Sequence, residues 1–328
     1  MGDGRYPVSF GRLVPADMPS AYYARPSAPR AWRRWLTSLP FHLTLFGLTI
    51  LTTLIVGAHI ELNYVHGLPA FDWDLSRAFF SSLYRNPSLL KLGVPFSLTL
   101  LSILLAHELG HYFACRHYGI RATYPYFIPA PTLIGTLGAF IRIKSPIVTR
   151  RALFDVGISG PLVGFVVAIP ALALAILYSK TAAPPHSPDA ITLGNPLAVI
   201  LLAKLLRPGT GLAQIALDPI GCAAWVGLFA TTLNLLPAGQ LDGGHILYAV
   251  LGDKHRTVSR GMFLALVPMG VFCWAGWMVW AVILLLVGLR HPVVMAPSEP
   301  LGGGRQLLAL VAALVFILTF IPTPFSIR

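Results

Sequence analysis

Long apolar stretches separated by short polar segments dominate this chain. A stretch of about 18 or more apolar residues is long enough to cross a bilayer as a helix. Six regions reach or approach that length, at 41–58, 94–118, 158–178, 215–236, 270–289 and 307–321, the last being the shortest. The pattern therefore predicts an all-α polytopic membrane protein with about six transmembrane helices.

Two regions depart from a simple spanning pattern. Residues 261–289 form either one long tilted span or a shallow helix that breaks at 268–270 and precedes a single span, and we favour the break because Pro268 removes a helix hydrogen bond. The apolar segment 124–142 contains three prolines, so it is not a span. Its β-branched and aromatic residues with two glycines, from 133 to 143, predict strands joined by a turn.

Composition agrees with a membrane protein. Hydrophobic residues make up 55% of the chain, charged residues 11%, and the mean hydropathy is +0.71, whereas soluble proteins are roughly a quarter charged. The net charge of +12 is concentrated before the first span, in the loop 117–151 and at 253–260. We interpret these groups as positive-inside signals with a cytosolic N-terminus, and not as a nucleic-acid surface.

Domain organisation follows from the same pattern. Residues 1–37 are rich in Pro, Ser, Ala, Gly and Arg without helical periodicity, which predicts a disordered basic cytosolic leader. Residues 38–328 then form one membrane-embedded domain, with its core at about 94–251.

The most informative motif is His107-Glu108-Leu109-Gly110-His111, inside the second apolar stretch. Side chains four residues apart share one helix face, so both imidazoles can bind one zinc ion while Glu108 reaches a water molecule beside it. The motif alone also occurs by chance in soluble helices. Here it lies at membrane depth, where ionisable groups are costly and usually functional.

A catalytic zinc site needs a third protein ligand, and Asp242 is the best candidate. It follows the apolar stretch 215–236, after Pro237 and Gly239, which would end that helix. Gly243 and Gly244 would let the backbone approach the metal closely. The alternative is that Asp242 caps the helix after it. His245 is a competing ligand, or a partner that orients the carboxylate.

The chain resembles the site-2 protease family of intramembrane zinc metalloproteases. The resemblance rests on the H-E-L-G-H motif at 107–111, on N-L-L-P at 234–237 leading to L-D-G at 241–243, and on F-D-V-G-I-S-G-P-L-V-G at 154–164 between them. It implies one Zn²⁺ per chain held by His107, His111 and Asp242, with Glu108 as general base. It also implies a prokaryotic plasma membrane as the location.

Two further roles are open. Asn234 either donates a hydrogen bond to the developing oxyanion or makes a structural hydrogen bond at a helix end. Family members carry a re-entrant β element with a G-x-x-G turn beside the active site, and the matching stretch here comprises Gly135, Thr136, Leu137 and Gly138. An unpaired strand edge there would pair with substrate; the alternative is a purely structural hairpin.

The predicted function is therefore hydrolysis of peptide bonds within or beside transmembrane helices of other membrane proteins, releasing a cytosolic signalling domain. Its partners would be a substrate transmembrane segment and the lipid bilayer, with no nucleic acid. Two rivals remain: a membrane metal transporter, which would need further intramembrane carboxylates or histidines along a path, and a non-proteolytic zinc-binding scaffold, which would usually have lost a ligand or the base.

Overall fold

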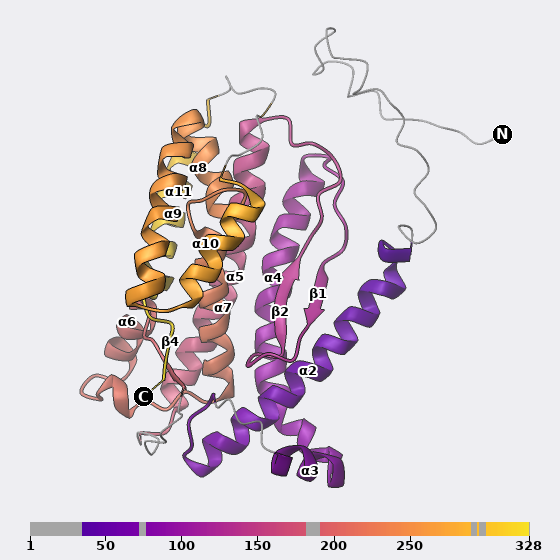
Figure 1. Cartoon of the computed structure of the whole chain (residues 1–328), viewed down its shortest axis with the longest axis vertical. Coiled ribbons are helices and arrows are strands. Elements are labelled where there is room, and N and C mark those ends of the chain that lie inside the picture. Colours follow the sequence, from indigo (N-terminus) through magenta and orange to yellow (C-terminus); the bar gives the residue numbers. More distant parts are fainter. Residues whose placement is uncertain (1–34, 72–76, 182–190, 290–293, 295–299, 328) are drawn as a thin grey trace, which may run out of the picture.

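The computed structural model describes residues 35–71, 77–181, 191–289, 294 and 300–327. The predicted leader at 1–37 lies almost entirely outside these residues. Within them the chain is mostly helical, and its helices lie side by side as a bundle with a β-hairpin beside it (Figure 1).

Three helical segments are long and apolar enough to cross a membrane. They are α2 (Leu39–His66), the run Pro87–His117 that joins the 3₁₀ helix η3 (Pro87–Gly93) to α4 (Val94–His117), and α5 (Arg150–Tyr178). Four shorter apolar helices have 10 to 17 residues: α6 (Leu197–Leu206), α7 (Pro219–Leu235), α10 (Gly276–Val287) and α11 (Gly303–Thr319). The chain is thus a membrane protein, and the count of six spans stays a prediction.

The centre of the bundle is formed by α4, α5 and α7, which pack on one another. A Cβ added at Gly110 of α4 would lie 2.7 Å from the backbone oxygen of Ser159 in α5, and one at Gly227 of α7 would lie 2.8 Å from the Ile103 side chain of α4. Small residues allow such close helix approach in lipid, where packing replaces the hydrophobic effect between helices. The three helices that bring the motifs together are therefore in direct contact.

Strands β1 (Tyr126–Pro129) and β2 (Thr136–Phe140) form an antiparallel pair, with β1 against α2 and β2 closer to α4 (Figure 1). The prediction of strands with a turn is right in kind, but Gly135–Gly138 is not the turn. The chain turns at 130–135, and 136–138 already belong to β2, because the Thr136 hydroxyl donates to the Ile128 carbonyl (2.8 Å) and fixes the pairing there.

The region 261–289 is broken, but not at 268–270. Helix α9 (His255–Phe272) continues through Pro268, and the break lies at 273–275, before α10. The Cys273 and Trp274 amides both donate to the Met269 carbonyl, which closes the helix end. A Cβ at Gly270 would lie 2.8 Å from the Met278 nitrogen, so glycine permits α9 and α10 to fold against each other. With 12 residues, α10 spans only about 18 Å.

The last helix is fixed at both of its ends. At one end, β4 (Phe325–Ile327) pairs with β3 (Ile191–Leu193), beyond the far end of α5. At the other, Arg305 of α11 donates to both carboxylate oxygens of Asp155 in α5 (Nε–Oδ1 2.9 Å, Nη2–Oδ2 2.7 Å) and to the Tyr118 hydroxyl (3.2 Å). The Tyr118 hydroxyl also donates to Asp155. This cluster joins the ends of α4, α5 and α11.

Replacing Arg305 by Gln should lower the stability of the purified protein by roughly 1–2 kcal/mol, because a bidentate, partly buried carboxylate loses its charged partner. Arg305→Lys keeps the charge but not the bidentate geometry, so its stability should lie between those of the wild type and Arg305→Gln. Thermal unfolding in one detergent measures all three proteins. Equal midpoints for wild type and Arg305→Gln would show that the cluster contributes nothing to stability.

Candidate metal centre

The H-E-x-x-H motif lies in the second half of α4, and the structure buries its polar side chains. His107, Glu108 and His111 are 6%, 5% and 7% exposed. The two imidazoles are one helical turn apart and face the same way, with a distance of 3.1 Å between their Nε2 atoms. Helical spacing thus brings them together as predicted.

Asp242 comes from another part of the chain to meet them. Its Oδ2 lies 3.4 Å from the Nε2 of His107 and 3.2 Å from the Nε2 of His111. Ligands placed 2.0–2.1 Å from a tetrahedral ion are about 3.3 Å apart, so the three atoms fit the corners around one zinc ion. Two imidazoles and a carboxylate are also a donor set that zinc accepts. The three side chains therefore fit a zinc ion in both geometry and chemistry.

The break between α7 and α8 (Asp242–Leu251) positions this carboxylate. Helix α7 ends at Leu235, and Asp242 is the first residue of α8, so Leu241 and not Asp242 occupies the capping position. The structure gives Gly243 and Gly244, the two residues after Asp242, a role other than the predicted close approach of the backbone to the metal. A Cβ at Gly243 would overlap the Leu235 carbonyl, and one at Gly244 would overlap a carbonyl of the preceding loop, so they admit the chain's own backbone.

Helix α5 orients the imidazoles from behind. The Nδ1 of His111 donates to the Val156 carbonyl (2.7 Å), which leaves Nε2 free to face the cluster. A Cβ at Gly160 would overlap the His111 ring, and one at Gly164 would lie 3.3 Å from the His107 ring. The F-D-V-G-I-S-G-P-L-V-G motif therefore provides the space in which both rings sit. No sequence signal identifies the carbonyl of Val156, because every residue carries one.

Glu108 and Asn234 both lie beside this group. The backbone amide of Ile141, the residue after β2, lies near the Glu108 carboxylate. The Asn234 side-chain nitrogen, at the end of α7, lies 3.3 Å from His107 Nε2. Asn234 is thus beside the cluster, where either predicted role remains available to it. Sequence reasoning missed Ile141, since its contribution is a main-chain amide.

The predicted substrate segment lies beside this centre but is not uniform. Thr136 is buried at 1% exposure and holds the hairpin, whereas Leu137 is 67% exposed. Gly135 faces α2, where a Cβ would lie 2.7 Å from the Thr52 oxygen, and Gly138 has open space around it. His245, the competing ligand, packs against Gly157 of α5. It is not part of the potential metal-binding group that the described residues form, which consists of His107, His111 and Asp242.

Comparison with known proteins identifies the family. The model of peptidase family M50 matches residues 95–275. The chain belongs to this family. The predicted resemblance to site-2 proteases is thereby confirmed, and the matched region contains all three potential metal ligands together with Glu108.

Curated relatives of this M50 protein are described as probable zinc metalloproteases. The EGY2 protein of Arabidopsis thaliana is 30% identical over 293 residues, 86% of this chain and 48% of the relative. EGY1 of the same plant is 28% identical over 291 residues (83% and 52%), and EGY3 of Oryza sativa subsp. indica is 26% identical over 246 (68% and 41%). The chain thus spans about half the length of these relatives. No solved structure matches the chain.

These names bear on two predictions. Family and relatives agree on zinc, which is the metal that the His107, His111 and Asp242 group would hold. All three relatives are named as chloroplastic proteins, so they give no support to the predicted prokaryotic plasma membrane or to an orientation of the N-terminus.

Replacing Gly160 by Ala should reduce zinc affinity by roughly 10-fold or more, because the new methyl group displaces the His111 ring from its position. Gly47→Ala is the control, since Gly47 is also helical but has nothing within 4 Å of its Cβ position. Zinc content after dialysis against a graded chelator series measures the effect. Unchanged zinc retention in Gly160→Ala would show that α5 does not constrain the site.

Proposed function

We propose that this chain is an intramembrane zinc-dependent endopeptidase that hydrolyses peptide bonds within or near the transmembrane helices of membrane proteins. One observation carries the proposal: two members of the His107, His111 and Asp242 cluster lie in a helix long enough to span a bilayer, with Glu108 buried beside them. A metal-binding group with an adjacent carboxylate at that depth suits chemistry on a substrate that is itself in the membrane.

Each side chain has a distinct task in this proposal. His107, His111 and Asp242 hold Zn²⁺, which supplies Lewis-acid polarisation of a carbonyl and activation of water. Glu108 takes the proton from the attacking water and later passes it to the leaving amine. Asn234, beside His107, donates a hydrogen bond to the oxygen on which negative charge develops.

The substrate would bind along β2. Among the residues that the structure describes, the β1–β2 sheet has two strands, so β2 has a strand partner on one side. An extended substrate segment can add to such an edge through main-chain hydrogen bonds. The Ile141 amide that reaches Glu108 belongs to the same run of chain. A peptide paired with β2 would therefore lie close to the general base.

Pairing with β2 also addresses the main obstacle to cutting a transmembrane helix. Peptide bonds in a helix are already hydrogen-bonded along the helix, so the substrate must unwind before a carbonyl can reach the metal. In the membrane an unwound segment needs replacement hydrogen bonds. A free strand edge provides them, which favours substrates that contain helix-breaking residues near the cleaved bond.

The rival functions have weaker support. Transport of a metal would need a series of binding groups across the bilayer. The part of the chain that the structure describes contains one group of three or more potential metal ligands. A non-proteolytic zinc-binding scaffold would not need Glu108 as a base, and this residue is present and buried.

We further propose that the basic end of α4, near Arg116, lies on the side of the membrane from which the protein is inserted. His107 is nine residues before Arg116, so the metal would lie about 13 Å along the helix from that boundary. Water would then reach the metal centre through this end of the protein.

Replacing Glu108 by Gln should preserve zinc content but reduce cleavage by about 10²- to 10⁴-fold, because the amide keeps the shape of the side chain and removes its basicity. The assay uses a panel of single-span substrates in liposomes, with zinc quantified in each preparation and a chelator-treated sample as control. Cleavage of the same bond at the wild-type rate by Glu108→Gln would reject Glu108 as the base.

Replacing Leu137 by Ala should raise KM several-fold and leave zinc content unchanged, because this exposed residue on β2 would contact the bound peptide. Leu98→Ala is the matched control. Leu98 is 65% exposed, but it lies near the first residues of α4, at the other end of that helix from His107 and His111. Kinetics on one substrate separates KM from kcat. An equal effect of the two substitutions would argue against a substrate site on β2.

A further inference from the structure

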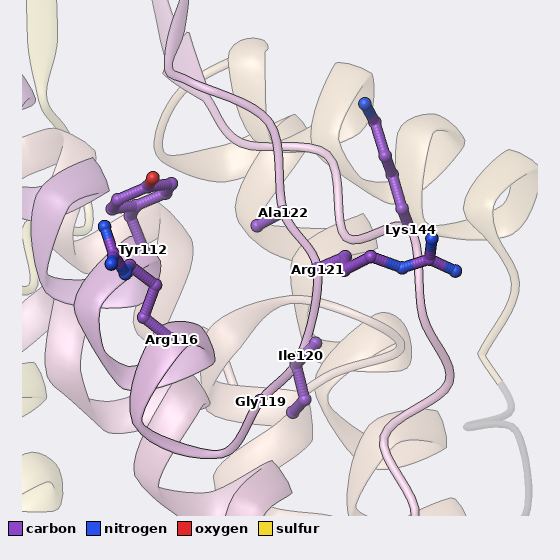
Figure 2. A pocket seen from close by; sticks show the side chains of 7 residues that line it. All are labelled: Tyr112, Arg116, Gly119, Ile120, Arg121, Ala122 and Lys144. Atoms are coloured by element: carbon purple, nitrogen blue, oxygen red, sulfur yellow. The ribbon is translucent and has the colours of Figure 1, made fainter. Parts of the chain in front are cut away.

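A basic hollow of about 460 Å³ lies where α4 ends and the chain turns toward the hairpin. Figure 2 shows Arg116 turned toward Tyr112 along α4 on one side of the hollow. On the other side, Arg121 and Lys144 extend from two neighbouring extended segments, and the charged end of Arg121 is directed away from α4. The remaining lining residues are Gly119, Ile120 and Ala122. The hollow is therefore bounded by the helix that carries His107 and His111 and by the base of the β1–β2 region.

The lining contains three cations and no acidic residue. Across the described ranges of the chain, no ion pair is found for Arg116, Arg121 or Lys144, although Arg121 Nε lies 3.5 Å from the Ser145 hydroxyl. Cations held around a concavity without a protein anion create a site for an external one. A phosphate group matches it, because arginine and lysine both bind phosphate oxygens.

Two simpler explanations cover only part of this arrangement. Arg116 lies in the last turn of α4 and interacts favourably with the negative end of the helix dipole, but Arg121 and Lys144 are outside that helix. The positive-inside rule explains the sign of the charge at this boundary. It does not explain why three cations from separate segments line one hollow.

Apolar surface next to the hollow indicates what carries the phosphate. Phe113 and Tyr124 are 60% and 52% exposed. The Tyr124 ring stacks on Tyr112, which lines the hollow, with 6.0 Å between ring centroids. Because α4 is a candidate span that ends at His117, these rings lie near its membrane boundary, where aromatic residues commonly gather. A headgroup in the hollow would have its acyl chains against this surface.

We propose that this hollow binds the phosphate headgroup of an anionic phospholipid. Basic pockets at the membrane surface are suited to such headgroups, and each cation near the surface adds to the attraction. The lipid binding does not rest on the proteolytic function proposed above, and it can be measured on protein that has no substrate.

The location of the hollow gives the lipid a structural role. The Lys144 amide donates to the Arg121 carbonyl (2.7 Å), and the Thr123 amide donates to the Arg142 carbonyl (3.0 Å), so the two segments form a short ladder. Three residues before Lys144, Ile141 reaches Glu108. A headgroup held in the hollow by Arg121 and Lys144 would bind to this ladder, next to the end of α4.

The test uses the full-length chain, purified in a zwitterionic detergent. Dioleoyl phosphatidylglycerol, dioleoyl phosphatidylcholine, inorganic phosphate and an acidic soluble peptide are each added, and thermal unfolding and native mass spectrometry are recorded. We expect only phosphatidylglycerol to raise the midpoint and to remain attached as a discrete adduct. The variant R116Q/R121Q/K144Q should bind it at least 10-fold more weakly.

Arg142→Gln is the matched control, because it removes one charge from the same ladder without changing the lining of the hollow. It should bind phosphatidylglycerol like the wild type. If the triple variant does not fold, as judged by its midpoint without lipid, the single variants Arg121→Gln and Lys144→Gln replace it, and each should weaken binding more than Arg142→Gln does.

Three outcomes would overturn the proposal. Equal binding by wild type and the pocket variants would mean that surface charge alone attracts the lipid. Equal protection by inorganic phosphate would assign the hollow to a soluble phosphate compound. Protection by the acidic peptide without protection by phosphatidylglycerol would assign it to a polypeptide.

Discussion

The close contact between α4 and α5 is the constraint on which the rest of this structure depends. Two imidazoles project from α4 toward α5, and they fit because α5 has glycine at 160 and 164. The same contact lets the Val156 carbonyl orient His111. Helix α5 continues through Pro161, although this proline has no amide for the Gly157 carbonyl. Small residues on α5 are thus a requirement of the centre itself.

The second requirement is that polar groups in the interior of a membrane protein must have partners. Asp242 satisfies it by meeting both imidazoles, and it reaches them because α7 stops at Leu235 and the chain begins again as α8. A broken helix exposes backbone groups, which is tolerated at membrane depth only inside protein. Here the glycines at 243 and 244 let that backbone pack against itself. The break is the means by which a distant carboxylate enters the centre.

The residues of the centre were predictable from sequence because their spacing carries the signal. His107 and His111 are one turn apart, so their meeting required no knowledge of packing. Asp242 was predicted because a catalytic zinc needs a third ligand and because this carboxylate follows a helix-ending proline and glycine. Main-chain contributions had no such signal, and the amide of Ile141 and the carbonyl of Val156 emerged only from the fold. The turn near Gly135 and the break near Pro268 were misplaced for a related reason. Glycine and proline indicate that the backbone is irregular nearby. Hydrogen bonds from Thr136 and Cys273 decide where the hairpin turn and the helix break lie.

The ion pair between Asp155 and Arg305 has a consequence for the order of assembly. The two residues are 150 positions apart in the chain. At 5–20 residues per second, a ribosome adds that length in roughly eight to thirty seconds. For most of this interval α4 and α5 are already synthesised, while Asp155 still has no guanidinium to bind. The nascent protein therefore brings α4 and α5 into the bilayer well before the helix that joins their ends exists.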